Sequence, residues 1–146
     1  QALLEDSAKI NPNPDILFLL GRIFYDAGEF PKATETLQSG MALDPDNPRW
    51  LEQLARVFAQ TDNKPMQIEV LQKLSRLDPD DLEKRKRLLK LLLQNNQKTE
   101  ALIAAREVLE IDVSFKEAQD LLLEHLQALG KNDELLKLKQ AFNPSR

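Results

Sequence analysis

The apolar positions of this chain recur every 34 residues. Four leucines are separated by that step: Leu20, Leu54, Leu88 and Leu122. A second apolar series follows at the same interval: Phe24, Phe58, Leu92 and Leu126. A series of residue types typical of turns keeps the step as well: Gly28, Asp62, Asn96 and Gly130. A period shared by apolar and turn positions indicates stacked supersecondary units, each of which buries its apolar face only against its neighbours.

Each period predicts two helices. Apolar residues recur at helical spacing between the turns, and no segment alternates with period two, so no strand is expected. The residues predicted to be helical include 1–10, 15–27 and 49–60, with later helices opening after Pro31 and Pro65 and the last ending near Phe142. We therefore predict an all-α chain of nine helices in antiparallel pairs.

Residues at the helix ends support these boundaries. Gly28 suits the left-handed conformation that ends a helix, and Pro31 suits a first turn, where its missing N–H costs nothing. Asp81 is expected to cap the helix that follows it. Asp44, Asp78 and Asp112 also keep the 34-residue step. We expect their side chains to hold the connecting loops through hydrogen bonds to the backbone.

The repeat resembles the tetratricopeptide repeat family, whose pattern reads W-x2-L-G-x2-Y, then A-x3-F, then P. The first full unit has Leu17-x2-Leu20-Gly21-x2-Phe24, Ala33-x3-Leu37 and Pro45. Later units depart from the pattern, and the last has Gln119, Leu135 and Lys139 at signature positions, as suits a polar capping repeat.

The resemblance implies an all-α, right-handed α-solenoid of stacked antiparallel helix pairs. We interpret residues 1–146 as a single domain of such repeats. Residues 1–13 would supply the second helix of a truncated repeat, followed by repeats at 14–47, 48–81 and 82–115 and a degenerate capping repeat at 116–146. Because the chain begins at Gln1, we expect it to be a piece of a longer protein, with Leu3, Leu4 and Ile10 packing on an upstream helix.

Composition narrows the function. A net charge of −4 argues against nucleic acid as the main partner, because phosphate binding usually requires a basic excess. The chain has no cysteine, which excludes disulfides and thiolate metal sites. No apolar run approaches the roughly 20 residues that span a bilayer. We expect no metal, no cofactor and no catalytic activity, and the compartment stays open.

In this family the first helix of each pair lines a concave surface on which partner segments commonly lie. One position of the repeat that faces this surface holds Arg22, Arg56, Lys90 and Glu124. A ladder of cations suits a segment that carries acidic groups, because arginine binds carboxylates through two parallel hydrogen bonds. The predicted peptide-binding residues are Phe18, Arg22, Tyr25, Arg49, Arg56, Lys86, Arg87 and Lys90. The alternative is a solvated face with ion pairs, such as Arg56 with Glu52.

Three sharper hypotheses are weaker. The carboxylate clamp by which some family members bind chaperone tails would need Lys or Asn where this chain has Phe18, Arg22, Gln53 and Glu83, and only Arg87 agrees. The basic run at 84–87 spreads around a helix axis and predicts a solvated face instead of a nucleic-acid patch. His125 is the only histidine, so it has no partners for a metal site.

The sequence thus predicts a non-enzymatic scaffold that binds a protein or peptide segment in the concave groove. A second hypothesis is an accessory or oligomerisation module of a larger enzyme or cofactor protein. In that case the N-terminal end would be the interface, and self-association would occur there.

Overall fold

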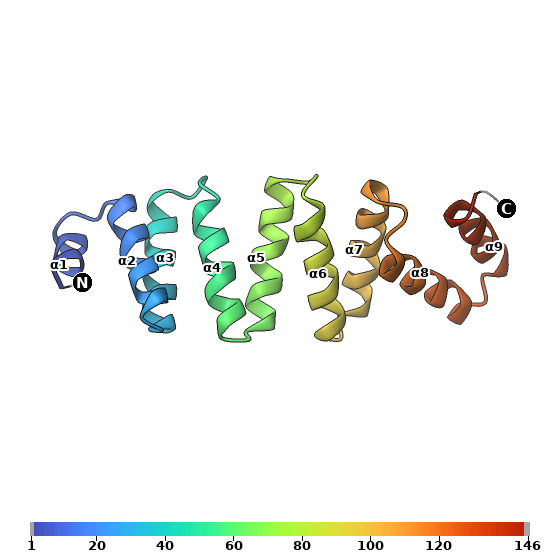
Figure 1. Cartoon of the computed structure of the whole chain (residues 1–146), viewed down its shortest axis with the longest axis horizontal. Coiled ribbons are helices and arrows are strands. Elements are labelled where there is room, and N and C mark those ends of the chain that lie inside the picture. The colour runs from blue at the N-terminus through green and yellow to red at the C-terminus, as the bar shows by residue number, and fades with distance from the viewer. Residues whose placement is uncertain (1, 145–146) are drawn as a thin grey trace. The chain divides into compact units, whose positions relative to one another are not determined.

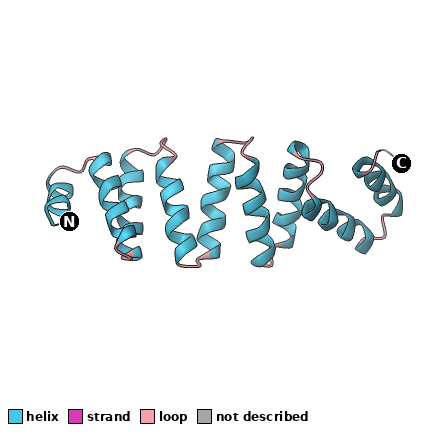
Figure 2. Ribbon diagram, viewed as in Figure 1, coloured by secondary structure: helices cyan, strands magenta, loops and turns pink. Residues whose placement is uncertain are grey.

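In the computed structural model, which describes residues 2–144 apart from the side chains of Ala8 and Ile10, the chain is helical throughout and has no strand. The described residues form nine helices joined by short loops (Figures 1 and 2). They are α1 (Ala2–Ile10), α2 (Pro14–Asp26), α3 (Phe30–Leu43), α4 (Arg49–Gln60), α5 (Lys64–Leu77), α6 (Leu82–Gln94), α7 (Lys98–Ile111), α8 (Lys116–Ala128) and α9 (Asn132–Phe142). The predicted fold class and the predicted helices are confirmed, with boundaries within a residue or two.

The chain divides into two compact units, residues 1–77 and 78–146. In the first unit, α1 packs on α2, α2 pairs with α3, and α4 pairs with α5, while α3 and α2 both contact α4. In the second unit, α6 pairs with α7, α7 contacts α8, and α8 contacts α9. We call α2, α4, α6 and α8 the first helices of their pairs, and α3, α5, α7 and α9 the second helices.

The four leucines of the 34-residue series are all buried. Their exposed fractions are 4% at Leu20, 2% at Leu54, 6% at Leu88 and 7% at Leu122. The last helix, α9, has no buried residue among its Asn132–Phe142 side chains.

One turn geometry joins the two helices of every pair. The residue in the left-handed conformation is Gly28 (φ 75°), Asp62 (φ 50°), Asn96 (φ 57°) or Gly130 (φ 69°). The N–H of the residue after it donates to the carbonyl of the second apolar series, and the distances are 2.8 Å to Phe24, 2.9 Å to Phe58, 2.9 Å to Leu92 and 3.1 Å to Leu126. This bond closes the helix end, which explains why apolar and turn positions share one period.

The aspartate series holds its loops mainly through the backbone. The carbonyls of Asp44, Asp78 and Asp112 accept from the N–H three residues on at 3.4, 3.3 and 3.2 Å. Among these side chains only that of Asp112 makes the predicted bonds, accepting from the N–H and hydroxyl of Ser114. The carboxylate of Asp44 instead lies 3.6 Å from Arg49.

Glycines allow the closest helix contacts in the first unit. A Cβ on Gly21 of α2 would lie 2.7 Å from the Leu37 side chain of α3. A Cβ on Gly40 of α3 would lie 2.3 Å from the ring of Trp50, which is fully buried on α4. A Cβ at either position would force the Leu37 side chain or the Trp50 ring to move, so these two glycines help set the spacing of three consecutive helices.

Replacing Leu54 by alanine is expected to lower the free energy of unfolding by ~2–5 kcal/mol, because the neighbouring helices can close only part of the cavity. Chemical denaturation followed by circular dichroism measures the change. The matched control is Leu19→Ala, since Leu19 is 47% exposed and should lose far less. Equal losses for the two variants would contradict the burial pattern.

Candidate protein-interaction site

The buried residues of each first helix define which of its sides is exposed. On α2 the buried residues are Leu17, Leu20, Gly21 and Phe24, which leaves Arg22 exposed on the opposite side. On α4 the residues left at the surface include Arg49, Glu52 and Arg56, at a spacing that keeps them on one side of a helix. We call this side of α2 and α4 the first-helix face of unit 1.

A charged pair joins the two helices on this face. The Arg49 guanidinium of α4 lies 2.9 Å from the Asp15 carboxylate near the start of α2, and 3.6 Å from Asp44. Asp15 sits in the first turn, where the side chain of Asn13 caps the helix by accepting from the Asp15 N–H at 2.8 Å. A carboxylate in a first helical turn is favoured by the helix dipole. The pair therefore aligns α2 with α4.

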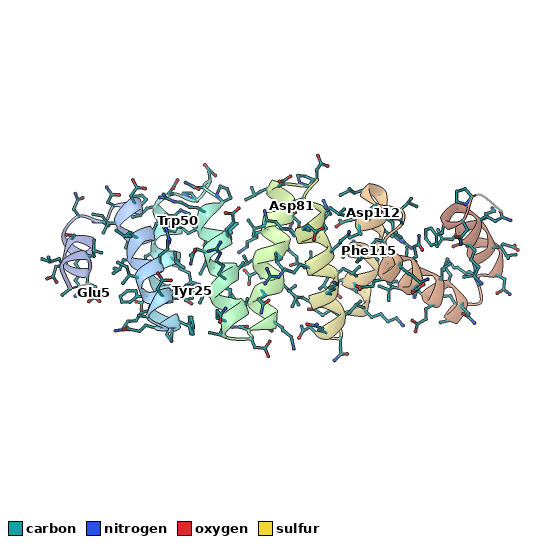
Figure 3. All side chains as sticks on the ribbon, in the orientation of Figure 1. Glu5, Tyr25, Trp50, Asp81, Asp112 and Phe115 are labelled. Carbon is teal, nitrogen blue, oxygen red and sulfur yellow. The ribbon has the colours of Figure 1, made fainter. Side chains whose placement is uncertain are left out.

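Aromatic rings hold the same arginine. Its guanidinium carbon lies 4.9 Å from the centroid of Phe18 and 4.7 Å from that of Trp50. The two rings meet edge to face. Trp50 is labelled in Figure 3. These are distances at which a cation is attracted to an aromatic ring. Only 28% of the Arg49 side chain is exposed. Arg49 is thus occupied by contacts within the chain, and one of these contacts is with the ring of Phe18.

Two predicted cations of unit 1 are free for a partner. Arg22 and Arg56 are exposed, and neither forms an ion pair with any residue in the described part of the chain. Tyr25, half-buried one turn after Arg22, contacts Phe30 edge to face with ring centroids 5.8 Å apart (Figure 3). The structure therefore brings Phe18, Arg22, Tyr25, Arg49 and Arg56 onto the two adjacent first helices of unit 1.

The remaining predicted residues lie on α6 in unit 2. Lys86 lies 3.4 Å from Asp112 and 4.0 Å from Glu83, and its ammonium is 4.7 Å from the centroid of Phe115. Lys90 lies 3.9 Å from Glu117 of α8. Arg87 is exposed and forms no ion pair within residues 2–144. On α6, therefore, Lys86 is held by carboxylates and a ring, and Lys90 is weakly paired. Arg87 has no ion pair among the described residues.

The basic run at 84–87 is spread around α6 as predicted. Lys84 pairs with Asp81 at 2.9 Å, and Arg85 reaches Glu107 of α7 at 2.7 Å. Lys86 lies beside Asp112, whereas Arg87 is exposed and has no ion pair among the described residues, so the four side chains form no single basic patch. In the described part of the chain no group of three metal-binding side chains occurs, and no helix is long and apolar enough to cross a membrane.

Sequence reasoning missed two residues of unit 1 that organise the site. Trp50 and Asp15 fix the position of Arg49, although neither belongs to the cation ladder. A signal for Asp15 was present, because Asp15 and Arg49 are 34 residues apart and so occupy the same position in successive repeats.

Comparison with known proteins identifies the repeat. Residues 1–57 match the family model described as tetratricopeptide repeat. This match covers the first 57 of the 146 residues. No curated protein sequence matches the chain.

Solved structures show the same fold at low identity. MamA of AMB-1 is 21% identical, with a TM-score of 0.67 over 98% of this chain and 79% of that one. MamA of MSR-1 is 20% identical, with a TM-score of 0.58 over 90% and 76%. Naa15/Naa10 bound to HypK-THB gives 14% identity and a TM-score of 0.74, covering 98% of this chain but 22% of that chain. At these identities the likeness is one of fold.

The Asp112 loop of unit 2 gives a test of local electrostatics. The hydroxyl of Ser114, which donates to Asp112 Oδ1 at 2.5 Å, holds the pKa of this carboxyl below its ordinary value, and Lys86 adds to the effect. We expect Ser114→Ala to raise the Asp112 pKa towards the ordinary value, as measured by a carboxyl-detected NMR titration.

The sign of the stability effect follows. A carboxyl whose folded pKa is depressed stabilises the fold above its unfolded pKa, and this contribution is lost as pH falls through the folded pKa. The stability difference between wild type and Ser114→Ala should therefore shrink on acidification. Ser39→Ala serves as the control, because that hydroxyl donates to the Glu35 carbonyl within α3. An Asp112 titration that is the same in all three proteins would contradict the assignment.

Proposed function

We propose that this chain is a non-enzymatic protein-interaction scaffold whose first-helix face of unit 1 binds an acidic peptide or protein segment. The observation that carries the proposal is the contrast between three arginines on that face. Arg49 is neutralised by two carboxylates and packed on two rings, whereas Arg22 and Arg56 are exposed and unpaired. Arg22 and Arg56 form no ion pair with the described residues, so their charges are available to a partner.

The packed arginine gives the face its direction. Asp15 and Asp44 repel further acidic groups at the Arg49 end, while Arg22 and Arg56 attract them further along α2 and α4. An extended segment would place carboxylates on Arg22 and Arg56 and an apolar group near Phe18 or Tyr25. Arginine can bind such carboxylates through two hydrogen bonds each.

The exposed Arg87 and weakly paired Lys90 on α6 support the same chemistry in unit 2. The scaffold role itself is supported by the fold and by the repeat protein Naa15, which was solved with Naa10 and bound to HypK-THB. The acidic nature of the segment is supported by the charges of this chain alone.

Reversing Arg56 to glutamate is expected to be the most damaging single change to binding. The side chain is exposed, so the fold should survive, as checked by circular dichroism. We expect proteins captured by wild type from a lysate of the source organism to be lost with Arg56→Glu, in quantitative mass spectrometry. Captured partners should bind with a Kd on the order of micromolar. Binding should weaken as salt rises, because exposed charges are screened over ~8 Å at physiological ionic strength.

Lys98→Glu is the matched control, since Lys98 is also an exposed cation and lies on the second helix α7. It should leave the capture by the first-helix face intact. If wild type and Arg56→Glu capture the same proteins equally well, the first-helix face is not the binding surface.

A second candidate function is self-association through α1. Leu3 is 83% exposed and Leu4 is half-buried, which leaves an apolar edge on this helix. The side chain of Ile10, which the sequence assigned to the same surface, lies outside the described residues. An accessory or oligomerisation module would use this edge as its interface.

If α1 is an interface, the double variant Leu3→Lys with Leu4→Lys should shift the chain towards monomer in sedimentation velocity. The control is Leu136→Lys, because Leu136 is 58% exposed on α9, away from α1 in the sequence. A mass distribution that the double variant leaves unchanged would remove this candidate.

A further inference from the structure

Three apolar grooves share one construction in this chain. In each groove a first helix forms the floor. The helices before and after it in the chain form the two walls. The α1–α3 groove lies over α2 and has a volume of about 610 Å³. The α3–α5 groove lies over α4, with about 480 Å³, and the α7–α9 groove of unit 2 lies over α8, also with about 480 Å³. These volumes fall in the range of roughly 300–1,000 Å³ typical of ligand sites.

Charge distinguishes the three. The α1–α3 groove has both signs on its walls, from Glu5, Lys9, Lys32 and Glu35. The α7–α9 groove is also mixed, with Arg106, Lys137 and Glu134. The charged side chains lining the α3–α5 groove are Lys73 and Arg76, both basic and both on α5.

The α3–α5 groove is otherwise apolar. Leu51, 8% exposed, forms part of its floor on α4, and Met41, Ala42 and Pro45 line the side of α3. Leu77 at the end of α5 is 58% exposed and adds to the apolar surface of the groove. Exposing this apolar surface to water is unfavourable, and a bound apolar group would remove the surface from water.

The two cations stand along one edge. Lys73 and Arg76 are three residues apart on α5, so they share a side of the helix. Lys73 pairs with Glu69 at 2.8 Å in an exposed i, i+4 contact, which contributes little stability. Arg76 is exposed and has no ion pair with the described residues. The groove therefore has an apolar bottom and one basic rim.

The backbone of the groove selects the shape of the occupant. Its walls and floor are helices, whose N–H and C=O groups are already hydrogen-bonded within each helix. An extended chain lying on this apolar surface would leave its own backbone groups without partners. A helix satisfies its backbone internally and presents only side chains, so it fits.

We propose that the α3–α5 groove binds an amphipathic helix of a partner protein, with its apolar stripe on Leu51 and Met41 and acidic residues facing Lys73 and Arg76. This surface is separate from the first-helix face. Leu51 and Arg56 are five residues apart on α4 and so point about 140° apart around its axis. The chain thus offers two protein-binding surfaces of different chemistry.

The test uses a synthetic peptide of roughly 18 residues, long enough to form a helix on binding. It carries leucines at i, i+3, i+4 and i+7 and glutamates along one side of that stripe. The whole chain is labelled with ¹³C at its methionine methyls, of which there are two. Met41 lines the groove, and Met66, near the start of α5, does not. We expect titration to shift the Met41 signal and leave the Met66 signal in place.

Charge reversal assigns the rim. Arg76→Glu should weaken the binding reported by the Met41 shift by about tenfold or more, whereas Arg56→Glu, an identical change on the first-helix face, should leave the binding reported by Met41 unaltered. A peptide of the same composition with its leucines scrambled off the stripe should not shift Met41. Both variants are checked by circular dichroism, and both replace exposed side chains.

The other outcomes overturn the proposal. Absence of a Met41 shift at millimolar peptide, equal binding of the scrambled peptide, or equal weakening by the two reversals would each do so. If Arg56→Glu alone weakens binding, the peptide lies on the first-helix face, which would support the proposed function while removing this groove. If Arg76→Glu alone weakens it, the groove stands whether or not the first-helix face proves to bind an acidic segment.

Discussion

Close approach between neighbouring helices is the constraint on which the rest of this structure depends. A repeat chain has no central core, so each helix can bury its apolar side only against the next one. Gly21 and Gly40 stand where any side chain would meet Leu37 or Trp50. Without these two gaps, Leu37 and Trp50 would have to move, and α2, α3 and α4 could not keep their observed spacing.

The same packing creates the proposed binding surface. Because Trp50 fills the space left by Gly40, Arg49, the residue beside it, contacts both Trp50 and Phe18 and reaches Asp15 on α2. One arginine is thereby fixed between two helices. Arg22 and Arg56 are left with no structural task on the adjoining surface, which is the condition under which exposed charges can act in recognition.

The two sides of the helix pairs offer different chemistry to partners. The first-helix face presents separated cations with aromatic edges, which suits an extended acidic segment. The α3–α5 groove presents a continuous apolar floor with a basic rim, which suits a helix. A scaffold built in this way can hold two partners at once, since the side chains involved lie on different sides of α4.

Periodicity alone determined the helices, their pairing and the buried leucines, because a 34-residue step in apolar and turn residues has one physical explanation. It also determined where the helices end, since Gly28, Asp62, Asn96 and Gly130 adopt the left-handed conformation on which the turn depends. The exposure of Arg22 and Arg56 could be predicted in the same way, from their position opposite the buried residues.

Only the tertiary structure decided which cations are free. Arg49, Lys86 and Arg56 look alike in the sequence, yet the first two are held by carboxylates and aromatic rings, and the third is not. The groove between α3 and α5 was equally hidden, because its floor and walls come from three helices whose side chains meet only after packing. Local pattern specifies which face of a helix is buried, whereas charge pairing and cavities depend on distances between residues far apart in the chain.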